Sequence, residues 1–127
     1  MSNFETDLDN RVLSDRVYRL NSPLIYRSDT LGLIAVPAGF QTDFASVPRI
    51  PLIYEAWGDR AHREAVIHDY LYRKDSIPVV DRSMADSVFK EAMKATGKPW
   101  RIWWFMWLGV RAGGWTAYHK LQVGDSI

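Results

Sequence analysis

The segment from Glu64 to Arg73 holds the densest group of side chains that titrate or bind metal ions. His68 is followed directly by Asp69, and Tyr72 comes one helical turn after the histidine. Positions i and i+4 share one face of a helix, so a helix here points His68 and Tyr72 the same way. Asp69 is turned about 100° from His68 and meets a different neighbour.

Asp86, on the following predicted helix, supplies a partner for the histidine. A short connection joins two helices of similar length, so we expect them to lie antiparallel with His68 facing Asp86. An imidazole that donates to a carboxylate has a fixed tautomer, and its other nitrogen accepts a proton. His68 is therefore a candidate general base, with Asp86 orienting it and Tyr72 donating its hydroxyl to Asp86. The alternative is a core histidine that pairs with Asp86 for structural reasons only.

Asp69 and the loop at residues 39–51 are candidates for a calcium site. The loop contains Asp43, and carboxylates and loop carbonyls are the oxygen ligands that calcium takes. An ion held by Asp43 and Asp69 would polarise an ester carbonyl and stabilise its oxyanion. The competing interpretation is that Thr42, Asp43 and Ser46 bond the local backbone.

The pattern of apolar residues predicts an α+β fold in a single domain that spans residues 1–127. A small N-terminal antiparallel sheet is expected from short β-type runs at residues 17–20, 24–27 and 31–36. It must pack on the helices that follow, because a few short strands are not stable alone. The two ends of the chain, residues 1–12 and 122–127, are expected to be flexible.

Three helices are expected after the sheet, at residues 58–73, 81–96 and 100–112. The first two form the antiparallel pair, and Asp81 and Gly97 are suited to cap the second helix at its two ends. The third helix is rich in tryptophan and apolar nearly all round. Such a helix is either deeply buried or partly an interface.

The composition narrows the range of partners. Lys and Arg number 16 and Asp and Glu number 15, so the net charge of +1 does not predict a nucleic-acid partner. The chain has no cysteine, which excludes disulfides and thiolate zinc sites. The longest uncharged apolar run, Ile102 to Val110, is about half the length of a membrane span. The N-terminus is polar and acidic, so we expect no signal peptide and no membrane span.

The pattern His-Asp-x-x-Tyr at His68, Asp69 and Tyr72 resembles the active-site helix of secreted phospholipase A2 enzymes. The run Thr42-Asp43-Phe44-Ala45-Ser46 is similar to the loop that precedes this helix in the bacterial and fungal branch of that family. Phe44-Ala45 stands where those proteins have Gly-Cys, and their disulfides are absent here.

This resemblance implies a role for each residue that matches. His68 would be the base, Asp86 would orient it, and Asp69 would bind calcium with Asp43 as an extra loop ligand. It also implies a helix pair similar to the phospholipase A2 core and a lipid or other ester as the substrate.

A second resemblance covers more of the chain, about residues 20–115. The runs Gly39 to Arg49 and Ala65 to Tyr72, with Ala85-Asp86 and the Trp-rich helix, are similar to a small family of unknown function. That family is common in tailed-phage and prophage genomes. The resemblance implies a phage origin, with a location in the host cytoplasm or the virion, and assigns no activity.

Two functions follow from these observations. The first is calcium-assisted hydrolysis of an ester, with lipid as the substrate class. The second is a non-enzymatic phage virion or tail accessory protein, in which the His68–Asp86 pair is structural and the Trp-rich helix contacts phage structural proteins. The enzyme needs an open cleft at His68 and oxygen ligands around Asp69, whereas the accessory protein should expose an apolar patch.

Overall fold

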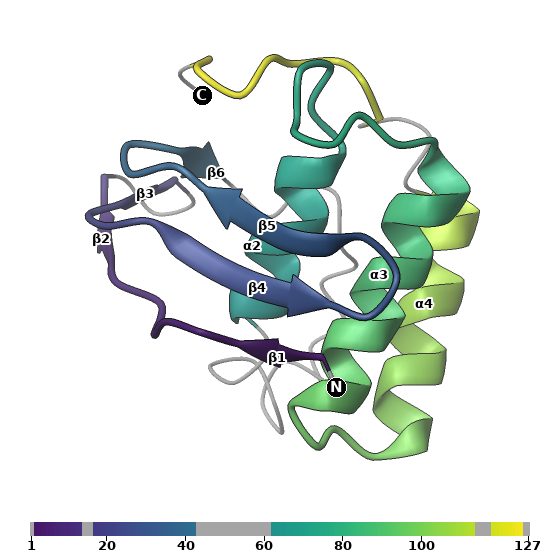
Figure 1. Cartoon of the computed structure of the whole chain (residues 1–127). Helices are drawn as coiled ribbons and strands as arrows, with labels where there is room; N and C mark the ends of the chain where they lie inside the picture. Colours follow the sequence, from purple (N-terminus) through teal and green to yellow (C-terminus); the bar gives the residue numbers. More distant parts are fainter. Residues whose placement is uncertain (1, 14–16, 43–61, 114–117, 126–127) are drawn as a thin grey trace.

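The computed structural model describes residues 2–13, 17–42, 62–113 and 118–125 of the chain. The fold is α+β, as predicted, with the strands gathered on one side of the molecule and the helices on the other (Figure 1). The described strands form two small antiparallel sheets instead of the single sheet that the sequence indicated.

The first sheet has the order β1-β4-β5, with strands β1 (Asn3–Phe4), β4 (Leu24–Ser28) and β5 (Gly32–Val36). β4 and β5 form a hairpin in which Leu24 lies opposite Val36 and Ser28 opposite Gly32. Gly32 closes the turn at a φ of 79°, a left-handed conformation that glycine adopts without strain. Alternate residues of β4 are buried, so one face of this sheet packs on the helices.

The second sheet has the order β2-β3-β6, with strands β2 (Asn10–Val12), β3 (Tyr18–Leu20) and β6 (Gln41–Thr42). Residues 1–12 thus supply β1 to one sheet and β2 to the other. Neither strand has the length or the apolar alternation that sequence reasoning needs. Whether the two ends of the chain are mobile in solution stays a prediction.

The described helices are α2 (His62–Leu71), α3 (Arg82–Ala95) and α4 (Trp100–Gly113), close to the predicted ranges. The capping of α3 is confirmed: Asp81 accepts a hydrogen bond from the backbone nitrogen of Met84 at 2.7 Å. After Thr96 the chain turns at Gly97, whose φ is 80°. Residues 58–61 of the first predicted helix lie outside the described residues.

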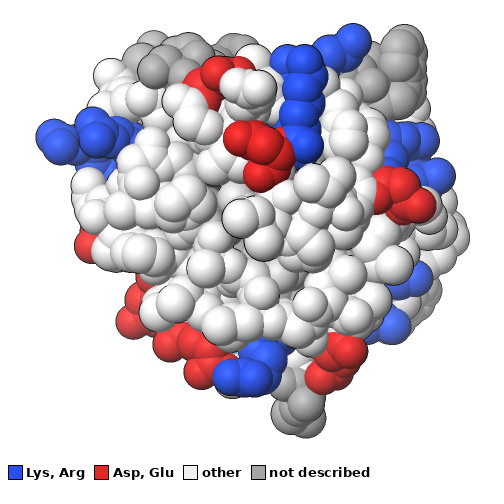
Figure 2. Space-filling model, turned by 45° about the horizontal axis from the view of Figure 1, so that its top comes forward, with Lys and Arg blue, Asp and Glu red and all other residues white. Residues whose placement is uncertain are grey.

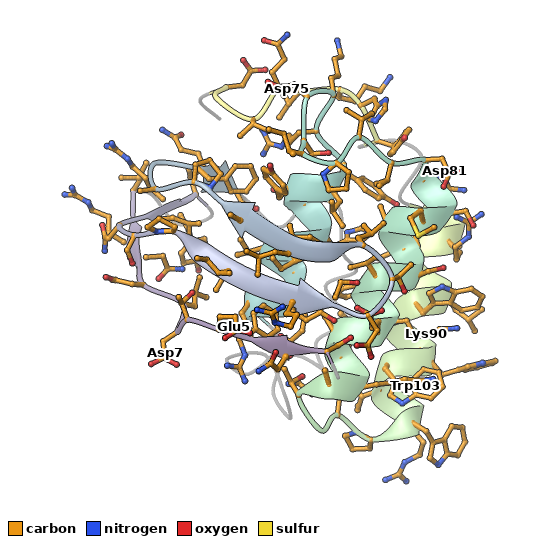
Figure 3. The ribbon with its side chains drawn as sticks, viewed as in Figure 1. Glu5, Asp7, Asp75, Asp81, Lys90 and Trp103 are labelled. Atoms are coloured by element: carbon orange, nitrogen blue, oxygen red, sulfur yellow. The ribbon has the colours of Figure 1, made fainter. Side chains whose placement is uncertain are left out.

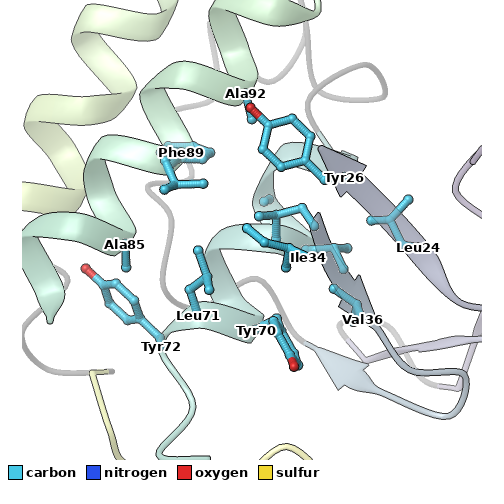
Figure 4. Close-up of a cluster of buried hydrophobic side chains, with 14 of the residues drawn as sticks. Leu24, Tyr26, Ile34, Val36, Tyr70, Leu71, Tyr72, Ala85, Phe89 and Ala92 are labelled. Carbon is cyan, nitrogen blue, oxygen red and sulfur yellow. The ribbon is translucent and has the colours of Figure 1, made fainter. Parts of the chain in front are cut away.

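The core lies between the β4–β5 hairpin and the helices α2 and α3 (Figure 4). Tyr26 and Ile34 from the sheet meet Leu71 from α2 and Phe89 from α3, and none of these side chains has exposed surface. α3 lies between α2 and α4, and α4 packs on the side of α3 that faces away from α2 (Figure 1). Every residue from Glu64 to Arg73 is buried, so the stretch densest in titratable groups is also the most enclosed.

Residues 118–125 return to the end of α2. The backbone nitrogen of His119 donates to the carbonyl of Tyr72 at 2.7 Å, and that of Lys74 donates to the carbonyl of Leu121 at 2.9 Å. No helix in the described ranges is long and apolar enough to cross a membrane. The likeness of the helix pair to the phospholipase A2 core stays a prediction.

Candidate functional site

Asp86 on α3 is the centre of a buried polar network that joins three helices. His68 Nε2 lies 2.7 Å from Asp86 Oδ1, and the Tyr72 hydroxyl donates to the same oxygen at 2.6 Å. Arg111 from α4 donates to Oδ2 at 2.9 Å. We call His68, Tyr72, Asp86 and Arg111 the Asp86 network. The predicted contacts of Asp86 with His68 and Tyr72 are therefore confirmed.

The helices position these side chains by simple spacing. His68 lies in the last turn of α2, and Tyr72 directly follows the end of this helix, one turn further on; their ring centroids are 4.1 Å apart. Phe89, one turn after Asp86 on α3, also packs against the imidazole, with its centroid 4.9 Å away. The imidazole is thus in contact with two aromatic rings and a carboxylate, which restrict both its position and its orientation.

The electrostatics of the network favour a charged Asp86. Burial alone would raise the pKa of Asp86, but the hydrogen bonds from His68 and Tyr72, together with Arg111, bring it below its usual value. Burial and the hydrogen bond to Asp86 raise the pKa of Tyr72, so its phenol stays protonated and donates. In the neutral imidazole, donation from Nε2 makes Nδ1 the acceptor, which is the tautomer of a general base.

The network is enclosed. The side chains of His68 and Asp86 have no exposed surface, and only Arg111, with its side chain 33% exposed, reaches solvent. The open cleft that the enzyme interpretation requires at His68 therefore does not match the burial of this side chain. The catalytic role of His68, Asp86 and Tyr72 stays a prediction.

Asp69, the predicted calcium ligand, lies in a different environment. Its Oδ2 is 3.2 Å from the guanidinium of Arg73, one turn further along the chain. Arg73 also donates to the carbonyls of Gln41 at 2.9 Å and Gln122 at 3.1 Å, so it ties β6 and the C-terminal segment to α2. Asp43, the second predicted ligand, lies outside the described residues. The described part of the chain contains no group of three or more His, Asp or Glu residues that could hold a metal ion; the calcium site stays a prediction.

Sequence reasoning missed two arginines of this region. Arg82 lies one turn before Asp86, with its guanidinium 3.7 Å from Oδ2, and donates to the carbonyls of Val110 and Arg111 at the end of α4. The i,i+4 spacing of Arg82 and Asp86 was a readable signal. Arg111 comes from a third helix, and no local pattern predicts its contact with Asp86.

A second buried polar cluster lies one turn before His68. Glu64 has no exposed surface, and its Oε1 is 3.0 Å from the ammonium of Lys98 and accepts a hydrogen bond from the Thr96 hydroxyl. Its Oε2 has no hydrogen-bond partner among the residues that the structure describes. Glu64, His68 and Tyr72 thus form one buried polar stripe along α2.

Together these features define a small α+β protein whose helices are joined through buried charged groups. Residues 18–110 match a protein family that is described as a protein of unknown function (DUF1353). The chain belongs to this family, which confirms the prediction of a family of unknown function. No curated protein and no solved structure matches the chain. The phage origin and the likeness to phospholipase A2 stay predictions.

Proposed function

We propose that the protein is a non-enzymatic binding protein and that the Asp86 network is its structural clamp. One observation carries this proposal: a single buried carboxylate receives hydrogen bonds from His68 of α2, from Tyr72 directly after this helix and from Arg111 of α4. Both carboxylate oxygens are occupied by these donors. The network therefore sets the position of α4 against α2 and α3.

The energetics of burial support a structural role. A buried carboxylate is stable only where charged or polar donors replace the water that it has lost. Asp86 has three such donors, and Phe89 and the ring of Tyr72 fill the space around His68. A catalytic histidine must meet its substrate, whereas His68 is surrounded by side chains of the fold.

The clamp fixes a helix whose outer side is apolar. Trp100 is 66% exposed, Trp104 47% and Phe105 45%, although large apolar side chains are ordinarily buried. An exposed apolar patch is the feature expected of an accessory protein, whereas an enzyme requires an open cleft at His68. The sequence resemblance to tailed-phage and prophage proteins supports a place for such a protein in a virion or tail, or in the host cytoplasm during assembly.

The first test measures the stability of the folded protein. Replacing Asp86 by Ala leaves His68, Tyr72 and Arg111 without their acceptor, and we expect the free energy of unfolding to fall by about 3–5 kcal/mol. The control is Asp7→Ala at an exposed carboxylate, with an expected change within about 0.5 kcal/mol. Urea unfolding measures both variants. A folded Asp86→Ala protein as stable as the wild type would contradict the structural clamp.

A second candidate function is ester hydrolysis, and the contact between His68 Nε2 and Asp86 Oδ1 at 2.7 Å favours it. In that role His68 takes a proton from water, the oxygen of the water attacks the ester carbonyl, and the imidazolium returns the proton to the leaving alcohol. Calcium, when bound by Asp69 and Asp43, would stabilise the oxyanion. Lipid is the predicted substrate class.

Hydrolysis of phospholipid and of a soluble ester, each with calcium and with a chelator, separates the two candidates. The binding protein predicts no hydrolysis beyond the buffer control. Calcium-dependent hydrolysis that His68→Gln abolishes, in a variant shown by circular dichroism to be folded, would establish the enzyme and overturn the first proposal. Asp69→Asn, compared with the wild type by calorimetry, reports whether calcium binds.

A further inference from the structure

We propose that the outer side of α4 binds an anionic lipid surface. This inference rests on the proposed function as a binding protein and names its partner. The α4 face, as we call it, consists of Trp100, Arg101, Trp104, Phe105 and Leu108, all of them exposed.

The α4 face is one continuous side of the helix. Its members stand at positions i, i+1, i+4, i+5 and i+8, which lie within about 140° of one another around a helix of 3.6 residues per turn. The opposite side carries Met106 and Val110, which are buried against the core. α4 is therefore apolar on both sides, and only the inner side is covered by the fold.

Basic side chains border the α4 face. The ammonium groups of Lys90 and Lys94 on α3 lie over the rings of Trp107 and Trp103, at 4.7 and 4.5 Å from the ring centroids. Figure 3 shows Lys90 of α3 close to Trp103 of α4, and Lys90 also lines a hollow with Asp29 and Thr30 of the β4–β5 turn. With Arg101 on the face itself, three cationic groups accompany the exposed aromatic rings.

The charge of the chain is unevenly distributed between its parts. Residues 82–113 contain six Lys or Arg and two Asp or Glu, whereas the remaining residues carry a net charge of −3. Of the two acids, Asp86 is held in its network and Glu91 accepts hydrogen bonds from Tyr26 at 2.6 Å and Thr30 at 2.8 Å. In Figure 2 basic side chains recur along the right edge, on the side of α3 and α4, with one acidic group among them; acidic side chains gather at the lower left, and a further basic group lies at the left edge. The overall charge of +1 conceals this asymmetry.

The chemistry of the face favours a lipid surface over a second copy of the chain. A symmetric dimer through α4 would bring Arg101, Lys90 and Lys94 of both copies together, and like charges repel. Five side chains are also far fewer than the about 20–30 residues that each partner contributes to a stable protein interface. Tryptophan and other apolar side chains with Lys and Arg beside them are typical of helices that lie in the plane of an anionic membrane surface.

The experiment is co-sedimentation of the full chain, in a chelator, with vesicles of phosphatidylcholine alone or of phosphatidylcholine and phosphatidylserine in equal parts. We expect binding to the anionic vesicles, with loss on addition of salt and weaker binding to the neutral ones. The variant Trp104→Ser/Phe105→Ser should lower the partition coefficient at least 10-fold. Arg101→Gln and Lys94→Gln should each lower it about 5-fold.

Matched controls keep the proposal falsifiable. Leu33→Ser removes an exposed apolar side chain from β5, and Lys74→Gln removes an exposed charge after α2; neither should change vesicle binding. Circular dichroism reports the fold of every variant. Absence of binding to anionic vesicles, or binding that the α4-face variants leave unchanged, would overturn the proposal.

Other occupants of the face give different results in the same series. A dimer detected by sedimentation and lost in Trp104→Ser/Phe105→Ser, without vesicle binding, would assign the face to a second copy. Binding of an acidic amphipathic peptide but of no vesicles would assign it to a protein. If calcium then produces phospholipid hydrolysis that His68→Gln abolishes, the proposed function fails, whereas vesicle binding through α4, measured in the chelator, still stands.

Discussion

Asp86 and its donors show how much of the helical layer depends on a few polar atoms. The two α2 donors differ in kind, because the Tyr72 hydroxyl has one hydrogen to give whereas His68 has two ring nitrogens. Without the Tyr72 hydroxyl, Asp86 loses one donor and keeps those from His68 and Arg111, so the network is weakened but not abolished. The same helix carries Tyr70, whose hydroxyl accepts a hydrogen bond from the backbone of Ile77 at 3.0 Å.

These two tyrosines give a matched comparison. Tyr72→Phe removes a hydrogen bond to a charged acceptor, and we expect the free energy of unfolding to fall by about 1.5–3 kcal/mol. Tyr70→Phe removes a hydrogen bond between neutral groups and should cost about 1 kcal/mol. Urea unfolding of both variants measures the difference. An equal or reversed order would show that the charge of Asp86 adds nothing to the strength of its hydrogen bonds.

The lowered pKa of Asp86 makes a prediction about acid stability. The folded protein holds this pKa below that of the unfolded chain, about 3.9, so the unfolded state binds the proton more readily. The stabilisation is complete above the unfolded pKa and is lost as the pH falls through the folded pKa. The lowered pKa of Glu91 adds a similar contribution.

Unfolding midpoints measured from pH 7 down to about pH 2 test this linkage. Asp86→Asn should flatten the loss of stability below about pH 4, and the slope that remains should belong largely to Glu91 and other carboxyls. Glu91→Gln is the companion variant. An acid transition with the same slope in Asp86→Asn as in the wild type would argue against a lowered pKa at Asp86.

At the scale of the elements, α4 is attached to α3 by polar contacts at its C-terminal end. Arg82, in the first turn of α3, donates to the carbonyls of Val110 and Arg111 in the last turn of α4, where helix carbonyls lack the N–H groups of a following turn. The positive charge of Arg82 also interacts favourably with the negative, C-terminal end of the α4 dipole. This arginine therefore caps one helix from the start of another.

Arg82→Gln should loosen the end of α4 more than it affects the rest of the fold. We expect faster amide hydrogen exchange in residues 108–113 and a loss of stability of about 1–2 kcal/mol. Arg101→Gln, on the exposed side of the same helix, is the control and should leave exchange unchanged. Uniformly faster exchange across the whole chain would instead mean that Arg82 supports global stability only.

The elements also show what could be predicted from the sequence. The contact of His68 and Tyr72 with Asp86 followed from i,i+4 spacing and an antiparallel helix pair, both of which are local rules. The i,i+4 spacing also predicts the ion pair of Asp69 with Arg73, whereas calcium binding at Asp69 stays a prediction.

The remaining features depend on contacts between distant parts of the chain. Arg111 meets Asp86 from another helix, and Lys98 meets Glu64 from beyond the end of α3. β1 and β2 are too short to show a period of two, and they exist because β4 and β3 offer them backbone partners. No pattern within residues 1–12 contains that information.

For the molecule as a whole, the C-terminal segment closes the end of α2. Arg73 donates to the carbonyl of Gln122 and lies 4.8 Å from the ring centroid of Phe40, while Asp75 accepts from the backbone of Val123. Strand β6, the end of α2 and residues 118–125 therefore meet at one place. Arg73 is itself 3% exposed because these segments cover it.

Removal of residues 118–127 should therefore destabilise the whole protein. The truncation exposes Arg73 and deletes its hydrogen bond to Gln122 and the backbone bonds of Tyr72 and Lys74, so we expect a loss of more than about 2 kcal/mol. Thermal unfolding of the truncated and full chains measures it. A truncated chain with an unchanged melting temperature would mean that the docking of this segment contributes nothing to stability.

The inner and outer sides of α4 differ in how freely their side chains can be substituted during evolution. The inner side of α4 contacts the rest of the fold through Met106, Val110 and Arg111. A substitution at any of them must therefore be compensated by a change elsewhere in the core or at Asp86. Trp104 and Phe105 are about half exposed, so the fold constrains them less. Binding specificity can therefore change through single substitutions on the outer side of this helix, while the fold that supports the helix stays the same.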